Sequence, residues 1–71
     1  MTTEEKIAHR KKIGGMIAEI RKEKGLTQEQ LSKMTGLDRA NIAKIENGRY
    51  NTGIDIISKI ADALEVEIKI E

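Results

Sequence analysis

The sequence predicts an all-α domain in which four short helices are joined by tight turns. Proline is absent, and the glycines separate stretches in which apolar residues recur every three or four positions. A chain of 71 residues has room for one domain with one core. We therefore expect a single compact domain over residues 1–71, with residues 2–12 as a helical extension at its amino end.

The first helix is expected to run to about Lys24. Thr2 or Thr3 can cap its start, and its apolar positions recur at spacings of four and three: Ile13, Ile17 and Ile20. Gly25 is suited to end it. Within this stretch Gly14–Gly15 costs roughly 1 kcal/mol per glycine relative to alanine. The pair predicts either a bend in the helix or the close approach of another part of the chain.

Residues 28–47 predict two helices joined by a short turn. Thr27 and Gln30 form a capping box that starts the second helix at Gln28, and Gly36 ends it. Asp38 is expected to cap the third helix. The second helix carries the apolar residues Leu31 and Met34. The residues expected to fix the two helices against each other are Leu31, Leu37, Ile42 and Ile45. Two helices with a glycine at the start of their turn form the helix-turn-helix unit that docks on DNA.

The last twenty residues predict a fourth helix followed by a strand. Thr52 and Asp55 resemble a helix start, and one stripe is apolar: Ile54, Ile57, Ile60, Ala61 and Leu64. Over 66–71 the period changes, because Val66, Ile68 and Ile70 alternate with charged residues. No other segment alternates, so this short β-strand is expected to pair with its own copy across a homodimer. The alternative is a solvated tail that continues the fourth helix. Ile56 lies off the stripe and is a candidate dimer contact.

Charge is unevenly distributed along the chain. The net charge is +1 and the isoelectric point about 8.0. Residues 1–51 carry +4 and residues 52–71 carry −3. The basic residues therefore coincide with the predicted helix-turn-helix, whereas the acidic end is expected to face away from DNA.

The residue types argue against an enzyme. Cysteine is absent, and the single histidine, His9, lies in a basic stretch where a surface role is expected. Gly14–Gly15 has neither the spacing nor the preceding strand of a phosphate-binding loop. We expect no catalytic residue, no metal, no cofactor and no small-molecule effector. No apolar run approaches the ~18 residues of a membrane helix, so we expect a cytoplasmic protein.

Four stretches together resemble the lambda-repressor-like family, also called the XRE or Cro/cI-type helix-turn-helix family: IRKEKGLTQEQL, TGLD, IAKIENGRY and ISKIADAL. The resemblance extends from about Ile13 to Leu64. It implies a four-helix DNA-binding domain and a structural ion pair between Arg21 and Glu46. The sequence departs from the family pattern at four positions, none of them expected to read bases: Ser32, Thr35, Ala43 and Thr52.

The resemblance and the side-chain chemistry point to the same base-reading residues on the outward face of the third helix. Arg39 can present two donors to guanine, and Asn41 can bond adenine through its amide. Ala40 is small enough to meet a thymine methyl group. Lys44, one turn along, reaches either a guanine or the backbone.

Other residues are expected at phosphates. Thr27 and Gln28 lie at the amino end of the second helix, where the helix dipole favours an anion. Asn47, Arg49 and Tyr50 follow the third helix. Tyr50 can instead cap the core. It is the only aromatic residue, which argues against single-stranded nucleic acid or RNA as the ligand.

Two function hypotheses follow, and a third is weaker. The first is a homodimeric transcriptional regulator, a repressor, that reads double-stranded DNA with two recognition helices about 34–36 Å apart. The second is an antitoxin that binds operator DNA and a toxin protein, because the ending ALEVEIKIE resembles antitoxins of the HipB type. The third is a protein-binding domain without DNA affinity, against which Gln28, Arg39 and Asn41 argue.

Overall fold

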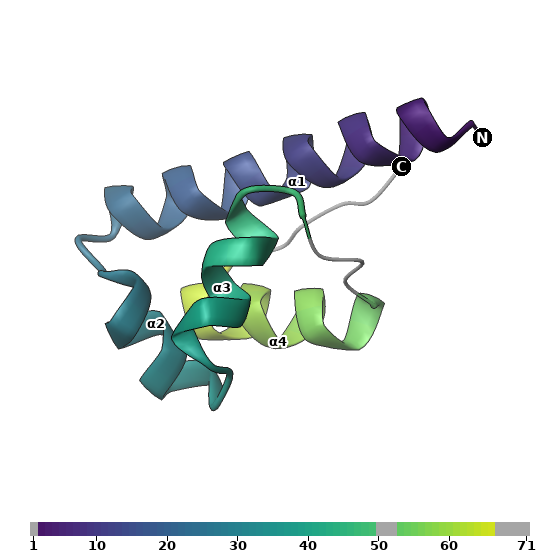
Figure 1. The fold of residues 1–71 in the computed structure, drawn as a ribbon. Coiled ribbons are helices and arrows are strands. Elements are labelled where there is room, and N and C mark those ends of the chain that lie inside the picture. The colour runs from purple at the N-terminus through teal and green to yellow at the C-terminus, as the bar shows by residue number, and fades with distance from the viewer. Residues whose placement is uncertain (1, 50–52, 67–71) are drawn as a thin grey trace.

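Four helices account for most of the chain (Figure 1), as expected. They are α1 (Thr3–Glu23), α2 (Gln28–Thr35), α3 (Arg39–Glu46) and α4 (Ile54–Leu64). The structure is a computed structural model that describes residues 2–49 and 53–66. Within these two ranges every regular element is a helix, and none has the length and apolar character needed to cross a membrane.

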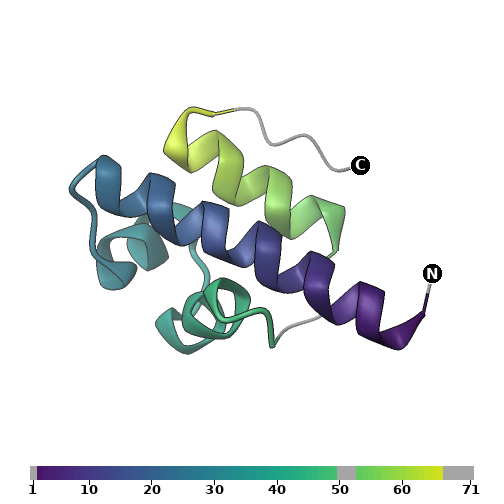
Figure 2. The same ribbon diagram turned by 90° about the horizontal axis from the view of Figure 1, so that it is seen from above.

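Helix α1 is continuous and includes the expected amino-terminal extension as its first half. A capping box starts it, because the Thr2 hydroxyl accepts from the Glu5 N–H and the Glu5 carboxylate accepts from the Thr2 N–H. The helix passes through Gly14–Gly15 without a break and projects beyond the other helices at its amino end (Figures 1 and 2). Of the two alternatives for the glycine pair, the close approach of another part of the chain is confirmed at Gly14, where an added Cβ atom would lie 2.1 Å from the Ile45 carbonyl oxygen.

The starts of α2 and α3 differ in how they are capped. Thr27 caps α2 through the predicted capping box with Gln30, and Gly36 ends the helix in the left-handed region at φ 76°. Asp38 occupies the N-cap position of α3, but its side chain makes no capping hydrogen bond. The boundaries were thus predicted correctly, whereas the capping role of the Asp38 carboxylate was not.

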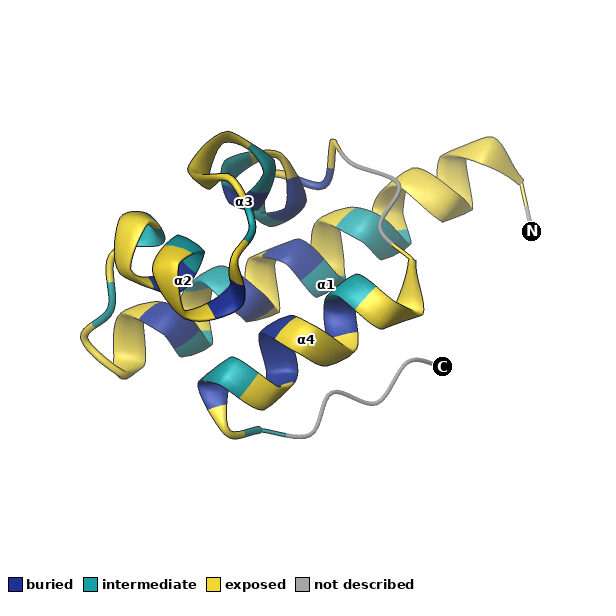
Figure 3. Ribbon diagram, turned by 90° about the horizontal axis from the view of Figure 1, so that it is seen from below, coloured by how far each residue is buried: buried dark blue, intermediate teal, exposed yellow. Residues whose placement is uncertain are grey.

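Helix α4 begins later than the sequence suggested. Its N-cap is Gly53, so the predicted start at Thr52 is wrong; Thr52 itself lies outside the described residues. Ile54, assigned to the core, is 67% exposed, and Ile56, assigned to a dimer contact, is half-buried against the core. The reason is that the inward stripe begins only at Ile57, while the first turn lies at the exposed edge of the domain (Figure 3).

Val66 also differs from expectation. After α4, Glu65 adopts a left-handed conformation at φ 56°, and the Val66 N–H donates to the Ala61 carbonyl at 3.0 Å. The Val66 side chain packs against the hydrophobic core of its own domain. Val66 is therefore part of a helix-ending turn rather than the start of a strand. Ile68 and Ile70 lie outside the described residues, so the pairing of that strand across a dimer has no support here.

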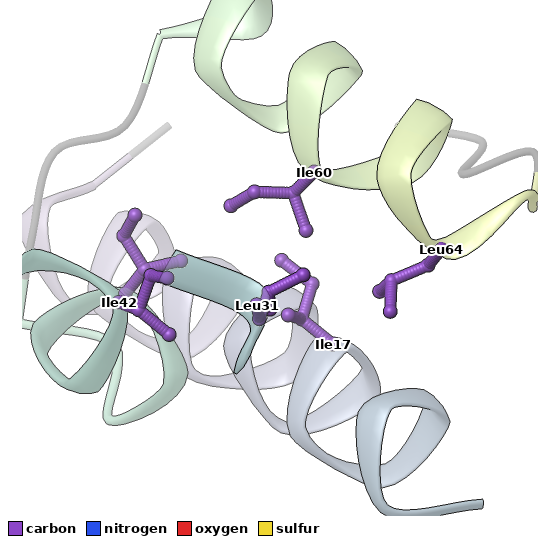
Figure 4. Packing of buried hydrophobic residues seen from close by; sticks show 6 residues of the cluster. Ile17, Leu31, Ile42, Ile60 and Leu64 are labelled. Carbon is purple, nitrogen blue, oxygen red and sulfur yellow. The ribbon is translucent and has the colours of Figure 1, made fainter. Parts of the chain in front are cut away.

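The core draws on all four helices. Ile17, Leu31, Ile42, Ile60 and Leu64 are fully buried and point toward one another (Figure 4). Burying each such side chain stabilises the fold by about 1.5–3 kcal/mol. Met34, the other apolar residue of α2, is 51% exposed. The core therefore fixes α2 and α3 against α1 and α4 through one row on each helix.

Candidate nucleic-acid interface

The amino-terminal turn of α3 presents the predicted base-reading residues outward. Ile42 and Ile45 hold the inner face of the helix in the core. On the opposite side Arg39, Ala40 and Lys44 are exposed, and Asn41 is half-buried. Since α3 has only eight residues, this row covers most of its free surface.

Two hydroxyl groups hold the turn between α2 and α3. Thr35 is buried; its hydroxyl donates to the Leu31 carbonyl at 2.8 Å and accepts from the Leu37 N–H at 3.2 Å. The Ser32 hydroxyl donates to the Leu37 carbonyl. Both residues are departures from the family pattern, and sequence reasoning did not assign them this role. The signal was present, because Thr35 lies four positions after the buried Leu31 and thus on the inward face.

A buried polar network joins α1 to the carboxyl end of α3. Arg21 donates to both oxygens of Glu46, from Nε to Oε2 at 2.7 Å and from Nη2 to Oε1 at 3.0 Å. Its Nη1 donates to the Leu26 carbonyl at 2.7 Å. Only 9% of the Arg21 side chain and 5% of the Glu46 side chain are exposed. This is the pairing that the family resemblance implied, and its two parallel hydrogen bonds fix the relative orientation of the helices.

The same network keeps Arg21 charged. The hydrogen bond to Glu46 raises the pKa of Arg21 and the Glu46 charge adds to it, whereas burial acts in the opposite direction. A raised folded-state pKa means that the stabilisation linked to the protonation of Arg21 is complete below the ordinary arginine pKa. It is lost only as the pH rises through the folded-state value.

Gln28 belongs to this network rather than standing free. Its Nε2 donates to Glu46 Oε1 at 3.0 Å, and the residue is half-buried. The predicted contact of Gln28 with a DNA phosphate stays a prediction, and in the structure its amide completes the hydrogen bonding of a buried carboxylate. Thr27, next to it, is exposed while its hydroxyl caps α2.

The residues after α3 are also placed at the surface. Asn47 is the C-cap and is exposed, as is Arg49. Between them Gly48 is buried, with a positive φ of 72°. Tyr50 lies outside the described residues, so its predicted phosphate contact stays a prediction. The structure thus places Arg49 beyond the carboxyl end of α3, and Thr27 beside the amino end of α2.

Comparisons with known proteins agree with this geometry. The Helix-turn-helix family model, HTH_3, matches residues 17–70. The chain is 37% identical over 60 residues to the ImmF control region 10 kDa protein of Bacillus phage phi105, covering 84% of this chain and 67% of that protein. It is 39% identical over 56 residues to the Immunity repressor protein of the same phage, covering 79% of this chain but 39% of that protein.

A solved structure extends the comparison to three dimensions. The restriction-modification controller protein C.AhdI from Aeromonas hydrophila shares the fold with a TM-score of 0.82 and 40% identity, covering 84% of this chain and 91% of the controller. Other relatives are HTH-type transcriptional regulators, which are not a class of enzymes. The chain therefore belongs to the helix-turn-helix family HTH_3, the XRE or Cro/cI type, whose members are DNA-binding transcriptional regulators.

Proposed function

We propose that this DNA-binding transcriptional regulator is a repressor that acts as a homodimer and reads its operator with α3 in the major groove. The observation that carries the proposal is the row of exposed Arg39 and Ala40 and half-buried Asn41 on a helix whose inner face is buried in the core. Such a row stays in register with the base edges because its helix cannot rotate without exposing the core. The two phage relatives, a control-region protein and an immunity repressor, support the regulatory role.

Each residue of the row has a base partner of matching chemistry. The Arg39 guanidinium is assigned to guanine O6 and N7, and the Asn41 amide to adenine N6 and N7. Ala40 leaves room for a thymine methyl group. Lys44, on the next turn, is assigned to a guanine or to the backbone beside it.

The phosphate contacts are proposed on both sides of α3. The network with Glu46 occupies the Gln28 amide, so we assign the phosphate at the amino end of α2 to the main-chain N–H groups of Gln28 and Glu29. Thr27 lies beside them. Asn47 and Arg49 are assigned to the backbone beyond the carboxyl end of α3. These contacts supply affinity that does not depend on sequence.

A dimer is proposed because one short recognition helix reads only a few base pairs. Two copies about 34–36 Å apart would read both halves of a near-palindromic site from one face of the duplex. Within α4 the exposed Ile54 replaces the half-buried Ile56 as the candidate contact. The antitoxin alternative depends on the ending of the chain, of which residues 67–71 lie outside the described part, and it stays a prediction.

Selection of bound sequences from a random pool of duplexes tests the proposal. Wild type is expected to select a near-palindromic motif, and Arg39→Ala to lose preference at one base pair per half-site, worth ~1–3 kcal/mol. Lys59→Ala is the matched control, because it removes an exposed positive charge from α4, away from the row. A wild-type protein that selects no motif would overturn the proposal, and an unchanged motif with Arg39→Ala would remove Arg39 from its role.

A further inference from the structure

Helix α1 meets the carboxyl end of α3 along one stripe, Lys11, Gly14 and Arg21, which we call the contact stripe. These positions follow the i, i+3 pattern of one helix face and continue it two turns on. Figure 1 shows the carboxyl end of α3 directed at the middle of α1. The contact stripe is thus the surface of α1 against which the carboxyl end of α3 packs.

Two glycines make this contact close. A Cβ atom on Gly14 would lie 2.1 Å from the Ile45 carbonyl oxygen and 2.9 Å from that of Glu46. A Cβ atom on Gly48 would lie 2.7 Å from Lys11 Cα and 2.8 Å from Lys11 N. All four atoms belong to the backbone, so no side-chain rotation can remove these overlaps.

Glu46 is held from two directions by the same stripe. Its carboxylate is bound by Arg21 Nε at 2.7 Å, and its carbonyl oxygen faces Gly14. If α3 moved away from Gly14, it would stretch the ion pair with Arg21, whose side chains are almost completely buried. Gly14 and Arg21 together therefore fix the position of α3 along α1.

From this contact we propose that Gly14 and Gly48 are positioning residues for DNA reading: they set where the base-reading row of α3 lies relative to the rest of the domain. The inference rests on the proposed role of α3 and goes beyond it. An added Cβ at Gly14 forces the 2.1 Å separation beyond 3.0 Å, so that α3 shifts by about 1 Å. Binding groups must be held within about 0.5 Å of their productive geometry. The shift therefore misplaces Arg39 and Asn41 against the bases without removing either side chain.

The adjacent glycine provides a matched control. Gly15 lies in the same helix, is exposed, and has no atom within 4 Å of an added Cβ. Gly15→Ala is expected to raise stability, because alanine is the better helix former. Gly14→Ala gains the same helix propensity but disrupts the close contact between α1 and α3. The two variants differ only in what the new methyl group meets.

The test compares affinity for the selected operator with affinity for a scrambled duplex, at a temperature where unfolding curves show each variant folded. Gly14→Ala is expected to lose roughly tenfold to hundredfold in operator affinity, the loss typical of a misplaced base contact. Its affinity for the scrambled duplex, which depends on phosphate contacts, should change little. Gly15→Ala should match wild type on both duplexes. A folded Gly14→Ala protein with the wild-type affinity ratio would overturn the inference, since a residue needed only for stability leaves that ratio unchanged.

If Gly14→Ala does not fold, a second pair of variants tests the inference. Gly48 and Gly25 both have positive φ, at 72° and 71°, but an added Cβ meets other atoms only at Gly48. Gly48→Ala and Gly25→Ala therefore carry the same backbone strain, and only Gly48→Ala should lower the operator-to-scrambled ratio. Equal ratios would contradict the inference.

Amide chemical shifts of residues 39–46 separate this inference from the proposed function. They are expected to change in Gly14→Ala and not in Gly15→Ala, whether or not DNA is bound. A wild-type protein that selects no operator would contradict the proposed function. Unchanged amide chemical shifts of α3 in folded Gly14→Ala would contradict the positioning role of Gly14.

Discussion

The two ends of α3 are held in opposite ways. At the carboxyl end, Glu46 is buried, paired with Arg21, and pressed against Gly14. At the amino end, Arg39 and Ala40 are exposed, and the Asp38 side chain makes no capping hydrogen bond. The helix is thus anchored to α1 at one end and presented to solvent at the other.

The difference teaches how a domain of this size separates stability from recognition. The Arg21–Glu46 pair fixes α3 at its carboxyl end, whereas Arg39 and Ala40, which are proposed to read DNA, lie exposed at its amino end. Substitutions at the anchored end should therefore change stability and positioning, whereas Arg39→Ala at the free end should change base preference and leave stability nearly unchanged. Three further variants test this division.

The largest effect is expected from Arg21→Met. Removing the guanidinium leaves the buried Glu46 carboxylate without its partner, which costs ~3–5 kcal/mol. Small domains without disulfides or metals often have a total stability of only ~3–5 kcal/mol, so this variant should be largely unfolded at room temperature by circular dichroism. Lys22→Met, the exposed neighbour, is the control. Equal stability of the two variants would show that the anchor contributes little.

A smaller effect is expected from Thr35→Val in the turn that leads to the free end. The Leu37 N–H loses its acceptor, and the free energy of unfolding should fall by ~1–3 kcal/mol. Thr35→Ser keeps the hydroxyl and is the control. Hydrogen exchange of the Leu37 amide measures the difference directly. It should accelerate in Thr35→Val and not in Thr35→Ser, and equal protection in both would contradict the role of the hydroxyl.

The smallest effect is expected from Asp38→Ala. Thr27→Ala removes a formed capping bond and should cost ~1 kcal/mol, whereas Asp38→Ala removes only a favourable charge near the helix start, worth about 0.5 kcal/mol. Urea unfolding curves of the two variants give the comparison. If Asp38→Ala cost as much as Thr27→Ala, the Asp38 carboxylate would cap α3 in solution and the amino end would be held more firmly than the structure indicates.

Local signals in the sequence were sufficient to predict the helices and the helix-turn-helix unit. The capping box of Thr27 and Gln30 and the turn at Gly36 appear in the structure at the predicted positions. Predictions failed where the outcome depended on a neighbouring element. Ile54 is exposed although it continues the apolar stripe, because the first turn of α4 lies at the edge of the domain. The hydrogen bond from the Gln28 amide to Glu46 was missed because the two residues are far apart in the sequence, while the phosphate contact of Gln28 stays a prediction.

The amino-acid sequence alone determined the order of the helices, most of their inward positions and the outward residues of α3, because helical periodicity and capping act over three or four neighbours. Only the tertiary structure decided what Gly14 and Gln28 do. Each of them meets a backbone or carboxylate group supplied by another part of the fold. The adjacent glycines show the reason. Sequence rules that consider only near neighbours treat Gly14 and Gly15 alike, and the two differ because α3 packs against Gly14.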